Sequence, residues 1–300
     1  RTGARSVRVN ASPHNILVIG PSWVGDMVMS QVLYIFLQQS RPGVAIDVLA
    51  PAWSEPLLQR MPQVRAAITM PVGHGELGLG RRWRLGRELR ARRYDQALLL
   101  PNSFKSALVP FFAGIRRRTG WRGEQRYGLV NDLRVLDEHT LPLMVQRFVA
   151  LGQAPGEAIP VRLPAPRLAI DRDQALDCGN RLGLAPERPL LALCPGAEFG
   201  GAKRWPDTYY AELAERYLEQ GWQVALFGSA NDQPVTAVIR QQCGNHPRCL
   251  DLAGRTRLAE AVDLLSLATA VVSNDSGLMH IAAALARPLV VVYGATSPDF

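Results

Sequence analysis

The sequence predicts an α/β protein made of two doubly wound domains. Its 300 residues are enough for two separate cores, and 47% hydrophobic with 20% charged residues is the composition of a globular chain. In both halves, apolar runs of four or five residues alternate with helical patterns, which is typical of parallel sheets covered on both faces. Residues 152–166, between the halves, contain four prolines and therefore indicate a linker.

The first half contains the elements of one such domain in order. Ile16–Ile19 is an apolar run that ends at Gly20, and a helical pattern follows over Asp26–Gln39. Further strands are expected at Ile46–Leu49, Ala67–Met70 and Gln96–Leu100, and further helices at Arg82–Arg93, Phe104–Ala113 and Leu143–Leu151. We therefore expect a first domain over residues 15–154.

The second half repeats this alternation after a helix over Arg172–Leu182. Strands are expected at Leu190–Cys194, Gln223–Phe227, Ala270–Ser273 and Leu289–Tyr293, and helices at Thr208–Gln220, Pro234–Cys243, Leu258–Ala268 and Leu278–Ala286. We expect a second domain over residues 167–300, truncated at its end because a covering helix normally follows the last strand. Ligands of such folds bind at the carboxyl ends of the strands, here in a cleft between the domains.

Charge is distributed unequally between the halves. Residues 1–165 hold 22 Lys and Arg against 11 Asp and Glu, a net +11, and residues 166–300 hold 12 against 15, a net −3. The basic half suggests a nucleic acid, a phosphorylated lipid or an acidic membrane surface as partner, although Arg81–Arg93 also fits a solvated helix. The four cysteines are scattered and form no CxxC pair, which indicates a reducing, cytoplasmic environment. No apolar run reaches about 20 residues, so we expect no membrane-spanning helix.

The first candidate site is the loop Gly20–Asp26 between a strand and a helix. Its glycines and the following helix start suit an anion, but the spacing matches neither a Walker loop nor GxGxxG. Asp26 is either a helix-start carboxylate, the commoner case, or a general base at the mouth of the cleft.

Two further segments follow strands in the second half. Cys194–Pro206 carries three glycines and the adjacent cations Lys203 and Arg204, which suits close approach to a diphosphate leaving group. In Ser273–His280, Asp275 or Ser276 is expected to cap a helix that carries His280 toward phosphate or ribose. Two segments could suggest a metal site. The spacing of Asp171-Arg172-Asp173 is that of metal-dependent transferases, but this run lies between the linker and a helix, away from any strand end, and the loop Gly73-His74-Gly75 has no partner ligands. We therefore expect no metal and no cofactor.

Taken together, these segments closely resemble the ADP-heptose:lipopolysaccharide heptosyltransferases, above all the heptosyltransferase II branch. The resemblance covers residues 16–300 and is carried by dense, specific runs: ILVIGPSWVGDMVMSQ, MPVGHGELGLGRR, LPNSFKSALVPFFAGI, RTGWRGEQRYGL, CPGAEFGGAKRWP and NDSGLMHIAAAL. It implies a GT-B fold of two Rossmann-like domains facing across a cleft. It also implies inverting, metal-independent transfer of L-glycero-D-manno-heptose from ADP-heptose to the first heptose of the lipopolysaccharide inner core.

The resemblance also assigns roles to residues of this chain. Asp26 matches the family's proposed base and Lys203 the lysine that stabilises departing ADP. The first domain would bind the acceptor, heptosyl-Kdo-lipid A, at the cytoplasmic face of the inner membrane, and the second domain the donor. Donor contacts are expected from Gly196, Ala197, Glu198, Lys203, Gly228, Ser229, Asp275, Ser276, Gly277 and His280. Acceptor contacts are expected from Ser22 and Trp23 and, because we expect them to follow strand ends in the basic first half, from Lys105, Arg118 and Arg122.

Three other functions stay open at this point. A related enzyme would act on Kdo or on a later heptose, and a non-catalytic sugar-nucleotide-binding protein would not need Asp26. The sequence pI of about 9.8 also allows nucleic-acid binding, although the resemblance implies no nucleic acid and no stable protein partner. One departure from the heptosyltransferase I branch is the absence of an acid in Phe227–Ala230, where that branch carries a donor-contacting glutamate.

Overall fold

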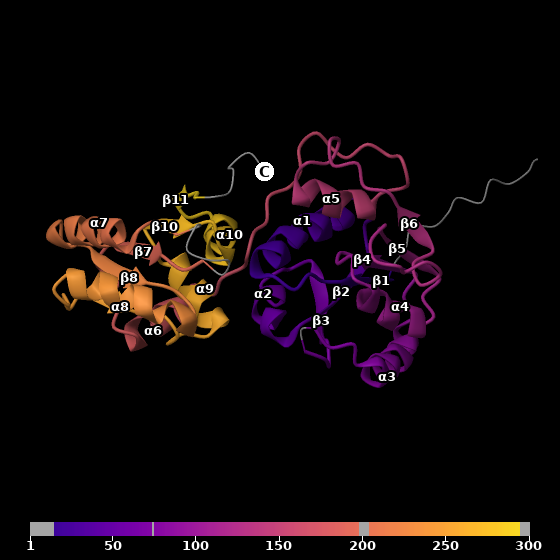
Figure 1. Cartoon of the computed structure of the whole chain (residues 1–300), viewed down its shortest axis with the longest axis horizontal. Coiled ribbons are helices and arrows are strands. Elements are labelled where there is room, and N and C mark those ends of the chain that lie inside the picture. Colours follow the sequence, from indigo (N-terminus) through magenta and orange to yellow (C-terminus); the bar gives the residue numbers. More distant parts are fainter. Residues whose placement is uncertain (1–14, 74, 198–203, 295–300) are drawn as a thin grey trace, which may run out of the picture.

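The computed structural model describes residues 15–73, 75–197 and 204–294. Two α/β domains lie side by side along the long axis of the molecule, the first in indigo to magenta and the second in orange to yellow (Figure 1). Each domain has one parallel sheet with helices packed against it. Among the described residues, no helix combines the length and apolar character needed to cross a bilayer.

The first sheet has six parallel strands in the order β3-β2-β1-β4-β5-β6. Its strands are β1 (Asn15–Ile19), β2 (Ala45–Ala50), β3 (Val64–Thr69), β4 (Gln96–Leu99), β5 (Arg117–Trp121) and β6 (Asp132–Arg134). Its helices are α1 (Val24–Ser40), α2 (Glu55–Leu58), α3 (Leu79–Leu89), α4 (Leu108–Phe112) and α5 (Met144–Gly152), with 3₁₀ turns η1 (Ala52–Ser54), η2 (Arg90–Arg92) and η3 (Phe104–Ala107). Strand order reverses between β1 and β4, where Val18 is paired with Leu98.

The second sheet has five parallel strands in the order β11-β10-β7-β8-β9. Its strands are β7 (Leu190–Cys194), β8 (Gln223–Leu226), β9 (Cys249–Asp251), β10 (Ala270–Asn274) and β11 (Leu289–Val292). Its helices are α6 (Arg172–Arg181), α7 (Asp207–Glu219), α8 (Gln233–Gln242), α9 (Leu258–Ser266) and α10 (Gly277–Ala284), with the 3₁₀ turn η5 (Ala230–Asp232). Here the order reverses between β7 and β10, so both domains have a switch point at the carboxyl ends of their central strands.

The apolar runs that predicted the strands are the cores of the domains. Ile16, Leu17 and Val18 of β1 have no exposed surface, and every residue of β7 is buried. Strands covered by helices on both faces need apolar side chains at consecutive positions, because neither face of the sheet meets water. This explains why unbroken apolar runs, and not alternating ones, mark the central strands.

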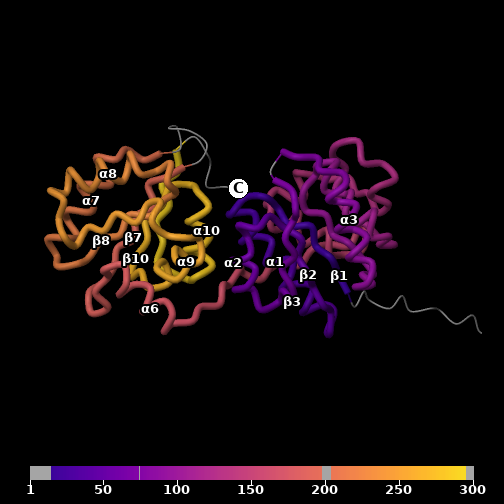
Figure 2. The backbone as a smooth tube through the Cα atoms, turned by 90° about the horizontal axis from the view of Figure 1, so that it is seen from below, coloured from indigo at the N-terminus to yellow at the C-terminus, as the bar shows by residue number. Residues whose placement is uncertain are grey.

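The two domains meet through α1 and α2 on one side and α9 and α10 on the other (Figure 2). Buried Gln31 of α1 donates to the carbonyl of Arg167 (2.7 Å) and accepts from its amide (2.8 Å), which ties the first domain to the residue directly after the linker. Arg60, after α2, pairs with Asp263 of α9 at 2.6 Å. These contacts hold α1 and α2 of the first domain against α9 and α10 of the second.

The structure corrects several sequence expectations. The strands β5, β6 and β9 were not predicted, because β5 is the charged run RRTGW and the other two have three residues each. The single helix expected over Phe104–Ala113 is a 3₁₀ turn followed by a short helix. The helix expected over Arg82–Arg93 begins earlier, at Leu79, and changes to a 3₁₀ turn after Leu89.

Candidate active site

A pocket of about 1120 Å³ opens at the carboxyl ends of the first sheet. Its walls come from the segments that follow β1, β2, β3 and β4, together with Trp121 at the end of β5 and part of α5. This is the edge at which the strand order reverses, so the pocket lies where the topology predicts a ligand. Of the residues expected to contact an acceptor, Ser22, Trp23 and Lys105 line it, and Asp26 lines it as well.

Asp26 lies in the first turn of α1, whose N-cap is Trp23. Burial raises the pKa of the Asp26 carboxyl above its ordinary value of 3.8. The fold therefore holds this carboxylate where water solvates it poorly, which makes it a stronger base than an exposed aspartate. A carboxyl group on a pocket wall with a raised pKa is a candidate acid or base, beyond a helix-start role.

Two arginines with buried side chains shape the same pocket, and neither was predicted. Arg126 donates to the carbonyls of Pro101 (2.8 Å) and Trp121 (2.7 Å), which joins the loop after β4 to the end of β5. Arg82 lines the pocket and donates to the carbonyls of Leu77 (2.6 Å) and Lys105 (3.2 Å). The hydrogen-bond acceptors of both guanidinium groups are neutral, so both groups bring positive charge to the pocket region.

In the second domain the corresponding switch point is organised by Asn274, the last residue of β10. Its fully buried amide donates to the carbonyl of Pro195 (2.7 Å), and its oxygen accepts from the amide of Trp205 (3.0 Å) and the hydroxyl of Tyr210 (2.9 Å). Pro195 and Trp205 flank the glycine-rich segment that we expect to contact a donor. One buried side chain therefore holds both ends of that segment.

Glycines allow a close approach beside that segment. A Cβ at Gly196 would lie 2.5 Å from Cγ of Asp232, and one at Gly228 would lie 2.7 Å from its Cβ. Asp232 accepts from the amide and hydroxyl of Ser229, both at 2.8 Å. Asp232 therefore places a carboxylate two residues beyond the run Phe227–Ala230, next to two of the predicted donor glycines.

The two switch points meet where α1 faces α10. A Cβ at Gly25 would lie 2.6 Å from Cδ2 of His280, and one at Gly277 would lie 2.7 Å from Cβ of Val24. Burial lowers the pKa of the His280 imidazole below its ordinary value and so favours the neutral ring, although Asp275 opposes this shift. The residue before Asp26 therefore packs directly on a residue of the other domain.

The other predicted site residues have mixed outcomes. Ser276 occupies the N-cap position of α10, but its side chain makes no cap hydrogen bond. Glu198 and Lys203, like His74, lie outside the described residues. Arg122 directly follows β5 and is exposed, but it is not among the residues that line the pocket.

The expectation that Arg118 follows a strand end is wrong. It is the second residue of β5, at the amino end of the strand, while the pocket lies at the carboxyl ends. Its guanidinium donates to the carbonyl of Leu129 (2.5 Å) and lies 5.6 Å from the ring centroid of Phe111. Because the charged run RRTG concealed the strand, the sequence placed Arg118 at the wrong edge of the sheet.

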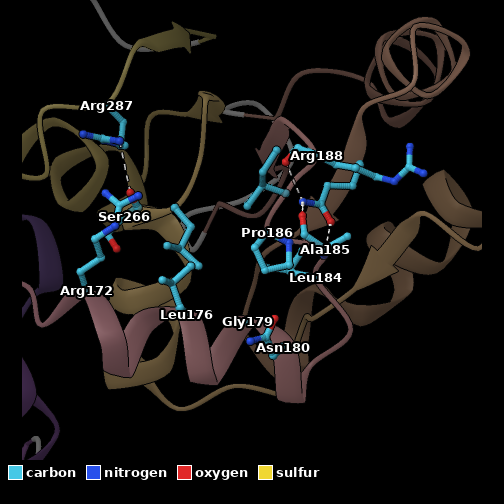
Figure 3. Close-up of a pocket in the computed structure, with 13 residues that line it drawn as sticks. Arg172, Leu176, Gly179, Asn180, Leu184, Ala185, Pro186, Arg188, Ser266 and Arg287 are labelled. Atoms are coloured by element: carbon cyan, nitrogen blue, oxygen red, sulfur yellow. Dashed lines mark hydrogen bonds between the residues drawn. The ribbon is translucent and has the colours of Figure 1, made fainter.

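A smaller cavity of about 160 Å³ lies in the second domain between α6 and the sheet (Figure 3). Leu190 and Gln223, the first residues of β7 and β8, line it, so it lies at the amino ends of these strands. Gln223 donates to the carbonyls of Ala185 (2.8 Å) and Arg188 (3.0 Å) across it. Its position opposite the switch point excludes it from the site formed by the carboxyl ends.

Two Rossmann-like domains that face each other at their switch points define the GT-B fold of glycosyltransferases. Residues 82–300 match the sequence profile of glycosyltransferase family 9 (heptosyltransferase). The chain belongs to this family and is a glycosyltransferase.

Relatives within the family cover nearly the whole chain. Lipopolysaccharide heptosyltransferase 2 of Escherichia coli is 55% identical over 292 residues, which are 95% of this chain and 84% of the relative. Lipooligosaccharide heptosyltransferase 2 of Haemophilus influenzae is 53% identical over 295 residues, 95% of this chain and 85% of the relative. The solved structure of E. coli ADP-heptose LPS heptosyltransferase II superposes with a TM-score of 0.88 at 53% identity, covering 95% of this chain and 86% of that chain.

Proposed function

We propose that this enzyme transfers L-glycero-D-manno-heptose from ADP-heptose to the first heptose of the lipopolysaccharide inner core, with inversion and without a metal. The observation that carries the proposal is the position of Asp26. Its carboxylate lies on the wall of the first-domain pocket, with a raised pKa, and follows the residue that packs on α10 of the second domain. The names and identities of the relatives support the donor and the type of acceptor.

In this mechanism Asp26 accepts the proton of the acceptor hydroxyl as that oxygen attacks the anomeric carbon of the donor. The new C–O bond forms on the face opposite to ADP, and the bond from the anomeric carbon to the diphosphate oxygen breaks with its electron pair leaving on ADP. One carboxylate is sufficient, because a diphosphate leaves without a proton when its charge is stabilised. We assign that stabilisation to Lys203 and to the N-terminus of α10.

The proposal divides the two substrates between the domains. A phosphorylated acceptor fits the first-domain pocket, whose lining includes the cations Arg82, Lys105 and Arg147. The donor fits the second-domain switch point, where glycines and a helix start follow β7 and β10. The enzyme would then act at the cytoplasmic face of the inner membrane, where its lipid acceptor is available.

The decisive experiment is Asp26→Asn, assayed with ADP-heptose and defined truncated cores by the mass gained by each core. We expect loss of turnover of about a thousandfold, with unchanged affinity for ADP-heptose. Asp173→Asn is the matched control, because Asp173 is also in the first turn of a helix but is exposed. Retained turnover in Asp26→Asn would refute the base assignment, and mass gain only on cores that end in Kdo or a later heptose would refute the acceptor. A reaction abolished by a chelator would contradict the metal-free mechanism.

A further inference from the structure

Helix α3 exposes large apolar side chains. Leu79 and Trp83 are 52% and 51% exposed, and Leu77, just before the helix, is 51% exposed. The guanidinium of Arg87 lies 5.7 Å from the ring centroid of Trp83. Leu79, Trp83 and Arg87 are spaced four residues apart and so lie along one side of the helix. A merely solvated helix has no need of an exposed tryptophan and two exposed leucines so close together.

The same helix is strongly basic. Residues 79–92 contain six arginines and a single acid, Glu88. Arg81, Arg84 and Arg87 are exposed, and Arg81 pairs with Glu76 in the preceding turn. Apolar side chains and arginines on one exposed helix are the combination found where proteins lie on anionic bilayers.

This helix also borders the pocket. Arg82 faces inward from α3 and donates to the carbonyl of Lys105 in η3, and both residues line the pocket. Phe104, next to Lys105, is 40% exposed. Both views place α3 on the part of the first domain that is remote from the second domain (Figures 1 and 2). The surface is therefore free of the second domain and next to the pocket.

We infer that Leu77, Leu79, Trp83 and Phe104, together with Arg81, Arg84 and Arg87, form a docking surface for an anionic phospholipid bilayer. We call it the α3 surface. The indole and leucine side chains enter the interfacial region, and the arginines pair with lipid phosphates. This inference rests on the proposed function, because it places the pocket at headgroup level, where the sugar of a lipid-linked acceptor enters while its acyl chains stay in the bilayer. Aliphatic side chains such as Leu77 and Leu79 favour a bilayer over a nucleic acid.

The test is co-sedimentation of the full chain with vesicles of phosphatidylcholine, with and without phosphatidylglycerol. We expect binding that depends on phosphatidylglycerol, and a decrease of about tenfold or more in Leu79→Ser/Trp83→Ser and in Arg84→Glu/Arg87→Glu. The matched control, Val238→Ser/Arg216→Glu, changes an exposed valine and an exposed arginine of the second domain and is expected to bind like the unmodified chain.

A second measurement separates docking from catalysis. With an acceptor that lacks acyl chains, both α3 variants are expected to keep their turnover, which also shows that they fold. Unchanged vesicle binding in both variants would refute the α3 surface. Binding of single-stranded DNA is measured for the same variants, and its loss without a loss of vesicle binding would mean that the surface binds nucleic acid and not a bilayer. If neither the unmodified chain nor the variants turned over the acyl-free acceptor, the proposed function would be refuted. The vesicle measurement would still show whether the α3 surface binds a bilayer.

Discussion

The imidazole of His280 lies against Gly25, although the two residues belong to different domains. The space for a Cβ at position 25 is filled, since it would lie 2.6 Å from Cδ2 and 3.0 Å from Nε2 of the ring. Asp26 is the next residue. The contact therefore couples the position of the proposed base to the helix that we assign to the donor.

Gly25→Ala is expected to lower kcat/KM by about ten- to a hundredfold, because the added methyl group must displace His280 or separate α1 from α10. His280→Ser, which removes the ring, is expected to recover part of this loss in the double variant. Gly80→Ala is the control, since Gly80 is also near the start of a helix but a Cβ there meets nothing within 4 Å. Steady-state kinetics of the unmodified chain, Gly25→Ala, Gly25→Ala/His280→Ser and Gly80→Ala test the coupling. Equal rates for Gly25→Ala and Gly80→Ala would contradict it.

Asn274 provides a second prediction, at the donor side. Asn274→Ala leaves the carbonyl of Pro195 and the amide of Trp205 without their partner, so the ends of the donor segment are no longer held together. We expect KM for ADP-heptose to rise about tenfold, with a loss of about 1–3 kcal/mol in unfolding free energy. Gln96→Ala is the comparison, because Gln96 is a buried amide of the first sheet that bonds Thr119 at 2.8 Å. It should lose stability but keep its donor KM, and a similar KM change in both variants would show that Asn274 has only a structural role.

Much of this fold was predictable from local pattern. The expected strand Leu190–Cys194 is β7 without change, and Ile16–Ile19 is β1 less one residue. Such central strands are buried on both faces, so their apolar character is visible in the sequence. Strand β5 is different, because its first two residues are arginines, and hydropathy alone reads them as a loop. In the structure their guanidinium groups are bonded locally, that of Arg117 to Asp132 and that of Arg118 to the carbonyl of Leu129.

The sequence predicts those site residues that come shortly after a strand, but not the contacts between segments that are distant in the sequence. Asp26 and Gly277 come directly after central strands, so topology alone puts them at the cleft. Asn274 bonds Pro195, which is 79 residues earlier in the chain, because β10 is the neighbour of β7. Arg126 joins segments in the same way across β4 and β5. Contacts of this kind depend on strand order, and no spacing in the sequence reveals them.

The raised pKa of Asp26 predicts an acidic limb in the activity profile. Because the base must be ionised, kcat/KM is expected to fall as the pH drops through a midpoint above 3.8. Ionisation of Asp26 is also expected to change the unfolding free energy in the direction opposite to that of an ion-paired carboxylate. With a folded pKa above the unfolded one, ionised Asp26 weakens the fold above pH 3.8, so Asp26→Asn is expected to keep or increase the unfolding free energy at pH 7. A stability loss in this variant would indicate a helix-start carboxylate and contradict the base.

Asp47 shows the reverse case. This fully buried carboxylate of β2 accepts from Arg65 (2.8 Å), Arg92 (2.9 Å) and Tyr94 (2.6 Å). Burial alone would raise its pKa, but these hydrogen bonds outweigh burial and hold the pKa of Asp47 below 3.8. The stabilisation is therefore complete above pH 3.8 and is lost as the pH falls through the lower, folded value.

Asp47→Asn is expected to lower the unfolding free energy at pH 7 by about 1–3 kcal/mol. The loss stays in this range because Arg65 and Arg92 are half-exposed, so water can solvate their guanidinium groups when the carboxylate is removed. Urea unfolding at pH 7 and near pH 3 measures this, and the gap between the variant and the unmodified chain should narrow at the lower pH. Glu76→Gln, which breaks an exposed pair with Arg81, is the control and should change stability by less than about 1 kcal/mol. A gap that stays constant with pH would mean that packing around position 47, and not its charge, stabilises β2.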